Sequence, residues 1–244
     1  MRCFGTATLA MLAIVLAPLT HAAQTFAEGT NFDVITPAQR TTVAAGKVEV
    51  MEVFSFGCPA CNRFQPIIEA LQQNLPANAQ LVFLPASFLP AEDWVVFQRA
   101  FFAAQALGIE TRTHQAIFDA IWETGELQTI DSDTHRLKNP LPSLEDVAKC
   151  YERLTGIKAD VFLATARSPA VDAKMQAADA QVTAMRVPAT PGIVVNGKYR
   201  INMDSLQNQL DLFNLVSYLV EKERSTEAML SYGNKLAAVC RGFS

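Results

Sequence analysis

Apolar positions along the chain form two sheet-like blocks separated by a long helical block. The first block begins with Lys47–Phe56, a nearly continuous apolar run that is typical of a central buried strand. Gly57 then permits a turn, a helix is expected to about Leu75, and Gln80–Leu84 reads as a second short strand. This order predicts a βαβ unit.

From about Ala91 to Val187 the apolar positions follow the helical period instead. A first helix starts near Trp94 and stops near Gly108, a plausible C-terminal position. Further helices are expected at 114–124, 143–155, 158–167 and 169–185. A block of this length without a convincing strand predicts a helical insertion rather than a loop.

The chain then returns to a strand pattern. Gly192–Val195 and Tyr199–Ile201 flank Asn196-Gly197, a strong signal for a two-residue hairpin. A helix at about Ser205–Arg224 and a helical tail at 226–240 follow, and an extended piece at Phe32–Ile35 precedes the first strand. The predicted fold class is α/β, with one mixed sheet and an inserted all-helical subdomain.

The N-terminus resembles a secretory signal peptide over residues 1–22, with basic Arg2, an apolar stretch and small residues before the expected cleavage site. The apolar stretch is shorter than the ~20 residues that cross a bilayer, which disfavours the alternative of a membrane anchor. Loss of this segment changes the net charge from −4 to −5, because Arg2 is its only charged residue. Such mild acidity argues against nucleic acid as a partner.

Four cysteines remain after residue 22, and two of them form Cys58-Pro59-Ala60-Cys61. In an exported protein such a pair is either a redox centre or half of a metal site. No second C-x-x-C is present and no histidine has ligand-like spacing, so no metal is expected. A purely structural disulfide is disfavoured because so small a loop constrains the unfolded chain little.

Cys58 is expected at a helix N-cap, where unpaired backbone N–H groups and the helix dipole favour its thiolate. Cys61, one turn inward, should be more buried and less ionised. The pair therefore has the chemistry of a redox-active disulfide, in which Cys58 attacks and Cys61 resolves the mixed disulfide.

FSFGCPAC after a buried strand, a helical insertion and then RVPATPGIVVNGKYRI resemble the DsbA-type thiol:disulfide interchange proteins of the bacterial periplasm, over about residues 35–220. The resemblance implies a thioredoxin-like domain at 23–89 and 188–244 and a helical insertion at 90–187. It also implies that Pro188 is the cis-proline beside the active site, with the Val187 backbone at the site's edge for pairing with an extended substrate peptide.

The same resemblance makes Glu52 the buried acidic residue of the family, able to shuttle a proton for Cys61. The alternative is an ordinary strand-end glutamate reaching solvent, as is expected of Glu49. The neighbouring strand QLVFLPAS offers no lysine to pair with Glu52, so a raised pKa is expected. Ala60 stands where the best-known members have a histidine, which predicts a weaker oxidant.

Cys150, in a predicted helix, and Cys240, in the tail, could form a second, structural disulfide; the alternative is two separately buried free thiols. The predicted function is that of an exported protein disulfide oxidoreductase without a cofactor. Its expected partners are unfolded or newly exported proteins and a membrane reoxidant of the DsbB type. It is expected to be located in the periplasm and to be a monomer. A disulfide reductase or isomerase, and a peptide-binding holdase with a vestigial redox pair, are the alternatives.

Overall fold

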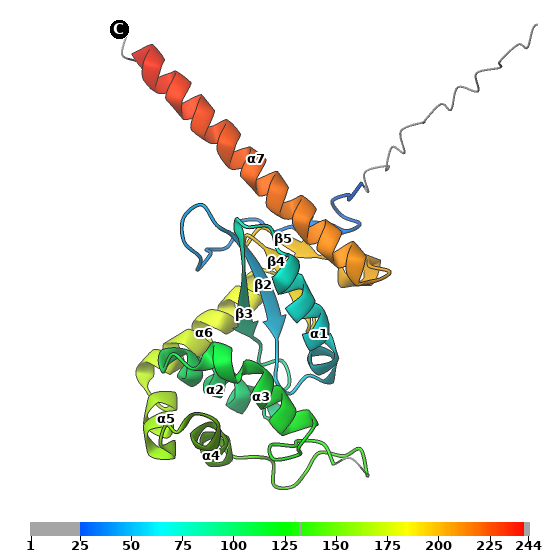
Figure 1. The fold of residues 1–244 in the computed structure, drawn as a ribbon, viewed down its shortest axis with the longest axis vertical. Coiled ribbons are helices and arrows are strands. Elements are labelled where there is room, and N and C mark those ends of the chain that lie inside the picture. Colours follow the sequence, from blue (N-terminus) through cyan, green and yellow to red (C-terminus); the bar gives the residue numbers. More distant parts are fainter. Residues whose placement is uncertain (1–24, 132, 242–244) are drawn as a thin grey trace, which may run out of the picture.

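The computed structural model describes residues 25–131 and 133–241; the predicted signal peptide lies outside them. Five strands occur in the described residues: β1 at Phe32–Val34, β2 at Val48–Phe54, β3 at Ala79–Pro85, β4 at Gly192–Val195 and β5 at Tyr199–Ile201. They form one mixed sheet in the order β1-β5-β4-β2-β3 (Figure 1). Each strand predicted from the sequence is present.

Strand β2 is the centre of the sheet, and all seven of its residues are buried. It runs parallel to β3, with helix α1 (Pro59–Asn74) as the crossover, and antiparallel to β4, where Val53 pairs with Gly192. Its apolar run is explained by this position, because a strand covered on both faces has no solvent side to carry polar residues.

The turn between β4 and β5 has both central residues at positive φ, +53° for Asn196 and +61° for Gly197. That geometry is the one which the Asn-Gly pair favours in a two-residue hairpin. A side chain at position 197 would also clash with the Gln39 carbonyl oxygen, which would lie 2.3 Å from a Cβ atom. The predicted hairpin is confirmed.

Helices occupy the chain between β3 and β4, as predicted. They are α2 (Trp94–Ala106), α3 (Glu110–Trp122), α4 (Leu144–Thr155), α5 (Ala159–Ala166) and α6 (Pro169–Ala184). Gly108 ends the first of them with a φ of +67°. Helix α3 begins at Glu110, four residues before the predicted start and two residues after that glycine.

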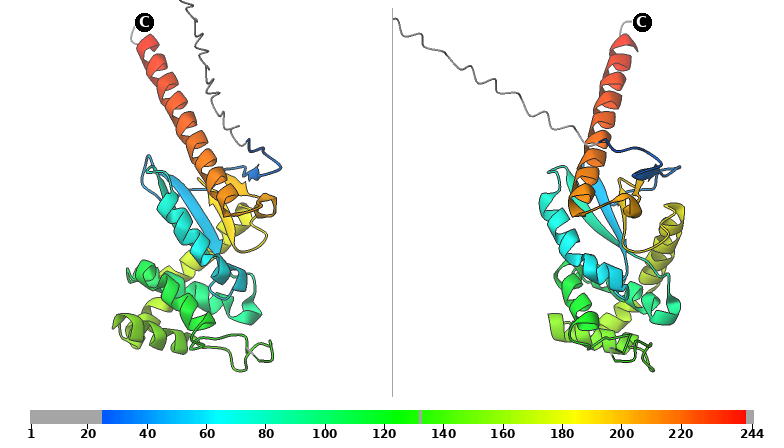
Figure 2. Two further views of the ribbon diagram at one scale, coloured as in Figure 1. Left: turned by 45° about the vertical axis from the view of Figure 1, so that its right-hand side comes forward. Right: turned by 90° about the vertical axis from the view of Figure 1, so that its right-hand side faces the viewer.

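Figure 2 shows the sheet and the helices that cover it. Two hydrophobic clusters hold these layers together. On one face of the sheet, α1 contributes Ile68 and Leu71, which are buried with residues of α7 (Gln209–Arg241). The second cluster joins the sheet to α6 and to the aromatic side chains of α2 and α3. The Cys58–Cys61 segment belongs to this second cluster, so the reactive pair lies where sheet and helical insertion meet.

Helix α7 is one continuous element, whereas the sequence predicted a helix and a separate tail. It starts at Gln209, after a 3₁₀ turn at Met203–Ser205. Ser225 and Thr226 do not interrupt it. No helix in the described ranges has the length and apolar character needed to cross a membrane.

The expectation for Glu49 is wrong, because this residue is fully buried rather than open to solvent. Its Oε2 atom accepts hydrogen bonds from the amide and the hydroxyl of Thr42, at 2.6 and 2.8 Å. The segment before β2 therefore folds back over the strand and supplies polar partners for one oxygen of this buried carboxylate, whereas Oε1 has none among the described residues.

Candidate active site

The reactive pair lies at the N-terminus of α1. Cys58 is the N-cap residue with an extended backbone, and Pro59 occupies the first turn, where its missing N–H group costs nothing. The amide of Cys61 donates a hydrogen bond to the Cys58 sulfur over 3.3 Å. Both thiols are free, so the structure describes the dithiol form of the pair.

Cys61 is more buried than Cys58, as the sequence predicted. Cys58 is nevertheless also buried, whereas an exposed sulfur was expected. The exposed fraction is 5% for Cys58 and 0% for Cys61. This order places Cys58 at the edge of the interior and Cys61 within it. An approaching substrate thiol therefore reaches Cys58 first.

The surroundings of Cys58 lower its pKa to about 6. The largest cause is the hydrogen bond from the Cys61 thiol; burial opposes it, and the Thr190 side chain and the backbone N–H groups of Cys61 and Ala60 add to the lowering. These donors stabilise negative charge on the sulfur. At neutral pH Cys58 is consequently a thiolate.

The pKa of Cys61 shifts in the opposite direction, to well above its usual range. Burial is the main cause, followed by the hydrogen bond to Cys58 and the negative charges of Cys58 and Glu52. One sulfur of the pair is thus charged and the other neutral, which gives the two cysteines different chemical roles.

Glu52 lies in β2 with an exposed fraction of 0%, and neither carboxylate oxygen has a hydrogen-bond partner among the described residues. Its register neighbours are Phe83 on β3 and Ile193 on β4, so no cation faces it from either strand. Burial, and then the negative charge of Cys58, raise its pKa well above the usual value. Burial therefore favours the protonated, neutral form of this carboxyl group in the dithiol protein.

The cis-proline predicted at Pro188 is wrong. The cis bond joins Thr190 and Pro191, whereas the Val187–Pro188 bond is trans. Pro191 directly precedes Gly192, which pairs with Val53 near the end of β2, so residues 190–191 are the part of this loop held beside the reactive pair. Pro188 lies three residues earlier and is exposed.

Thr190, which sequence reasoning missed, contacts the reactive sulfur. When protonated, the Cys58 thiol donates to the Thr190 carbonyl oxygen over 3.5 Å. The Thr190 hydroxyl is buried and has no other partner among the described residues, so it is free to donate to the Cys58 thiolate, whose pKa it lowers. Val187 instead packs inside the loop, where its Cγ1 atom would lie 2.8 Å from a Cβ on Gly192. The sequence did contain a signal for the correct proline, because Pro191 directly precedes the predicted strand Gly192–Val195 and Pro188 does not.

Two tryptophans hold the turn that leads into α1. Trp122 Nε1 donates to the Phe56 carbonyl oxygen over 2.9 Å. The indole of Trp94 covers Gly57 so closely that a Cβ there would lie 2.9 Å from its Cδ1 and Nε1 atoms. Position 57 requires glycine because the Trp94 indole lies so close to its backbone. The two tryptophans together hold the turn that places Cys58 at the start of α1.

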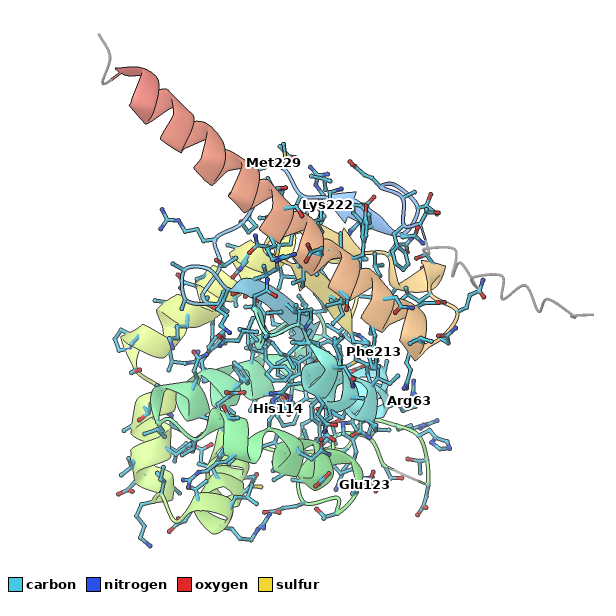
Figure 3. The ribbon with its side chains drawn as sticks, turned by 45° about the horizontal axis from the view of Figure 1, so that its top comes forward. Arg63, His114, Glu123, Phe213, Lys222 and Met229 are labelled. Carbon is cyan, nitrogen blue, oxygen red and sulfur yellow. The ribbon has the colours of Figure 1, made fainter. Side chains whose placement is uncertain are left out.

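A cluster of aromatic side chains supports this turn from beneath. His114 of α3 lies within it (Figure 3), 5.2 Å from the Phe56 ring and 4.9 Å from the Phe54 ring, measured between ring centroids. Burial lowers the pKa of His114 to about 3, so the imidazole is neutral. This side chain is therefore part of the apolar support and adds no charge near the sulfurs.

Of the two alternatives for Cys150, the disulfide with Cys240 is contradicted and the free thiol is confirmed. Cys150 is a buried free thiol in α4, and burial raises its pKa to about 11. Helix α4 and the C-terminal end of α7 lie at opposite ends of the molecule (Figure 1). The side chain of Cys240 lies outside the described part of the chain.

Comparisons with known proteins agree with this geometry. A family model described as thioredoxin matches residues 43–212. The thiol:disulfide interchange protein DsbA of Pseudomonas aeruginosa is 34% identical over 180 residues, which cover 74% of this chain and 78% of that protein. DsbA of Azotobacter vinelandii is 31% identical over 230 residues, with 89% and 100% covered.

Solved structures give the same answer. The oxidoreductase DsbA from Xylella fastidiosa has a TM-score of 0.69 and 32% identity, covering 82% of this chain and 98% of its own. DsbA of Pseudomonas aeruginosa has a TM-score of 0.67 and 31% identity, covering 83% and 97%. These relatives and the paired cysteines at the start of α1 show that the chain belongs to the DsbA family, with a thioredoxin-like fold and a helical insertion, and that it is a thiol:disulfide oxidoreductase.

Proposed function

We propose that this protein is an oxidase, which transfers the Cys58–Cys61 disulfide to unfolded or newly exported proteins in the periplasm. The observation that carries the proposal is the pKa of Cys58, lowered to about 6 at the N-cap of α1. A stabilised thiolate favours the dithiol form, so the disulfide form gives up its bond readily. The signal-peptide pattern of residues 1–22 supports export.

The exchange begins when a substrate thiolate attacks Cys58 Sγ. The Cys58–Cys61 bond breaks, a bond to the substrate sulfur forms, and the sulfur of Cys61 leaves and takes a proton. A second substrate thiolate then attacks the substrate sulfur of the mixed disulfide, and Cys58 leaves as a thiolate. Two electrons pass from the substrate dithiol to the cysteine pair, which a membrane partner of the DsbB type would reoxidise.

Glu52 is the proposed proton exchanger for Cys61. The buried thiolate that forms when Cys61 leaves is costly, since burial strongly favours the neutral thiol. A neutral carboxyl group within the same strand-and-turn unit can donate that proton and regain one later. Direct protonation of the Cys61 thiolate by solvent is disfavoured, because both Cys61 and Glu52 have an exposed fraction of 0%.

Substrate peptides are proposed to lie along the backbone at Thr190–Pro191, in the place that the sequence assigned to Val187 and Pro188. The Thr190 carbonyl oxygen already lies 3.5 Å from the Cys58 sulfur. Phe88 and Leu89, which precede α2, are exposed by 38% and 44%, and the Phe88 ring lies 6.4 Å from the Trp94 ring that covers Gly57. Backbone pairing with an apolar flank suits many sequences.

The test is an equilibrium redox titration of the Cys58–Cys61 pair against glutathione. An oxidase requires a potential more oxidising than about −200 mV, and a value near the thioredoxin value of about −270 mV would make the protein a reductase. In parallel, Cys61→Ser should accumulate mixed disulfides with exported proteins through Cys58. The matched control is Cys150→Ser, which should leave exchange unchanged. Absence of trapped species would favour a peptide-binding holdase.

A further inference from the structure

Helix α7 continues well beyond the residue that anchors it to the body of the protein. Glu223 is that anchor: its carboxylate accepts hydrogen bonds from Asn196, Lys198 and Tyr199 at 2.7 to 2.8 Å, and it is 5% exposed. From Arg224 to Arg241 the helix projects away from the sheet and the insertion (Figures 1 and 2). Met229, on this projecting half, is 77% exposed (Figure 3).

Apolar residues in the projecting half follow the spacing of a coiled-coil seam. Met229, Tyr232, Leu236 and Val239 are separated by three, four and three positions, and Phe243 follows four positions later in the sequence. Alternate steps of three and four define the two core positions of a heptad, which share one narrow face of a helix. The remaining positions are small or polar, apart from Leu230.

A helical segment of this kind needs a partner. It contains Gly233 and Asn234, both poor helix formers, so intrinsic helix propensity stabilises it little. Helical stability in such a segment comes from burying its apolar face. The backbone of this segment points away from the sheet and the helical insertion, so neither runs alongside it (Figure 1).

The composition of the segment favours a second copy of the chain over a membrane surface. Interfacial helices carry many lysines and arginines on a polar face. Residues 225–241 contain only Lys235 and Arg241 as basic residues, together with Glu227. None of these three occupies a seam position, so two copies of the seam meet without placing charges in their core.

We infer that the projecting half of α7 pairs with the same segment of a second copy, so that the protein forms a dimer through its C-terminal helix. This replaces the sequence-based expectation of a monomer. The N-terminal end of α1, with the reactive pair, lies toward the helical insertion, whereas the free end of α7 points the other way (Figure 1). Both active sites of the dimer therefore stay open to substrate.

Sedimentation equilibrium of the full mature chain in reducing buffer tests the pairing, because reductant removes any disulfide through Cys240. Wild-type protein should approach the mass of two chains with rising concentration. Leu236→Lys places a charge in the seam and should shift the mass to one chain. Asn234→Lys adds the same charge on the opposite face and should leave the dimer intact.

A wild-type protein that stays at the mass of one chain overturns the inference, as does equal behaviour of the two lysine variants. Co-sedimentation of monomeric wild-type protein with vesicles of anionic phospholipid would assign the helix to a membrane surface instead. The redox potential of the Cys58–Cys61 pair should be the same in both variants. Failure of the dimer is thereby distinguishable from failure of the proposed oxidase.

Discussion

The sulfur of Cys58 lies 3.5 Å from the carbonyl oxygen of Thr190, a residue 132 positions further along the chain. The pairing of β4 with β2 brings these groups together, because Gly192 lies opposite Val53. The helix end and the loop before β4 consequently act on the same sulfur.

The thiolate of Cys58 in the reduced protein should appear with a midpoint near pH 6. Ultraviolet absorbance of the thiolate, or the rate of alkylation as a function of pH, measures it. Cys61 and Cys150 stay protonated in this range because burial raises the pKa of each thiol. Cys58→Ser should therefore abolish the transition, and a midpoint near the ordinary value of 9.0 would contradict the assignment.

The same shift predicts how the stability of the reduced protein depends on pH. The pKa of Cys58 is about 6 in the folded state and 9.0 without the protein's influence, so unfolding takes up a proton between these values. The resulting stabilisation is complete above pH 9 and is lost progressively as the pH falls from 9 to 6. In denaturant titrations, the free energy of unfolding of the reduced protein should increase relative to that of the oxidised protein between pH 6 and pH 9. The same pH dependence for both forms would contradict this prediction.

Replacing Thr190 by valine should raise the pKa of Cys58. The Thr190 side chain lowers this pKa, and valine keeps its shape without the hydroxyl group. A hydrogen bond to a charged group contributes about 1.5–3 kcal/mol, so a rise of roughly one to two pKa units is expected. Alkylation kinetics of the reduced variant provide the measurement, with Thr183→Val on the exposed side of α6 as the control. An unchanged midpoint would show that the Thr190 hydroxyl does not act on the sulfur.

Replacing Glu52 by glutamine should stabilise the protein more at neutral than at acid pH. Burial raises the folded-state pKa of Glu52 well above 4.5, so the unfolded chain releases a proton that the folded protein retains. The wild type therefore loses up to about 1.4 kcal/mol of stability per pH unit above 4.5, a loss that glutamine removes. Urea titrations of both oxidised proteins across this range should diverge, and profiles that stay parallel would contradict a raised pKa.

A histidine at position 60 should make the pair more oxidising. Ala60 is half-buried next to Cys58, and its backbone N–H group already lowers the pKa of that thiol. A protonated or hydrogen-donating imidazole would favour the thiolate further and thus the dithiol form. Glutathione titration of Ala60→His, with Ala60→Gln as the uncharged control, gives the potential. If the redox potential of Ala60→His is not higher than that of Ala60→Gln, the charge of the imidazole has no such effect.

The features of the fold that the sequence predicted correctly are those that depend on residues close together in the chain. The apolar run of β2 and the helical period of α2 to α6 each depend on residues close together in the chain. The Asn196-Gly197 turn is equally local, since both residues adopt positive φ within one hairpin. The same holds for Cys58, whose N-cap position follows from the strand, glycine and proline around it.

Long-range packing decided the features that the sequence left open or predicted wrongly. Which of Pro188 and Pro191 lies beside Cys58 depends on the register of β4 against β2. Whether Cys150 has a disulfide partner depends on the separation of α4 from the end of α7.

The sequence by itself determined the elements, the reactive pair and the different chemistry of its two sulfurs. Only the tertiary structure decided that Thr190 and Pro191 complete the site, and that Glu49 is buried beneath Thr42. The physical reason is that secondary structure and helix capping depend on neighbours within a few residues. Contacts between distant segments depend instead on how whole elements pack, and no local pattern encodes that packing.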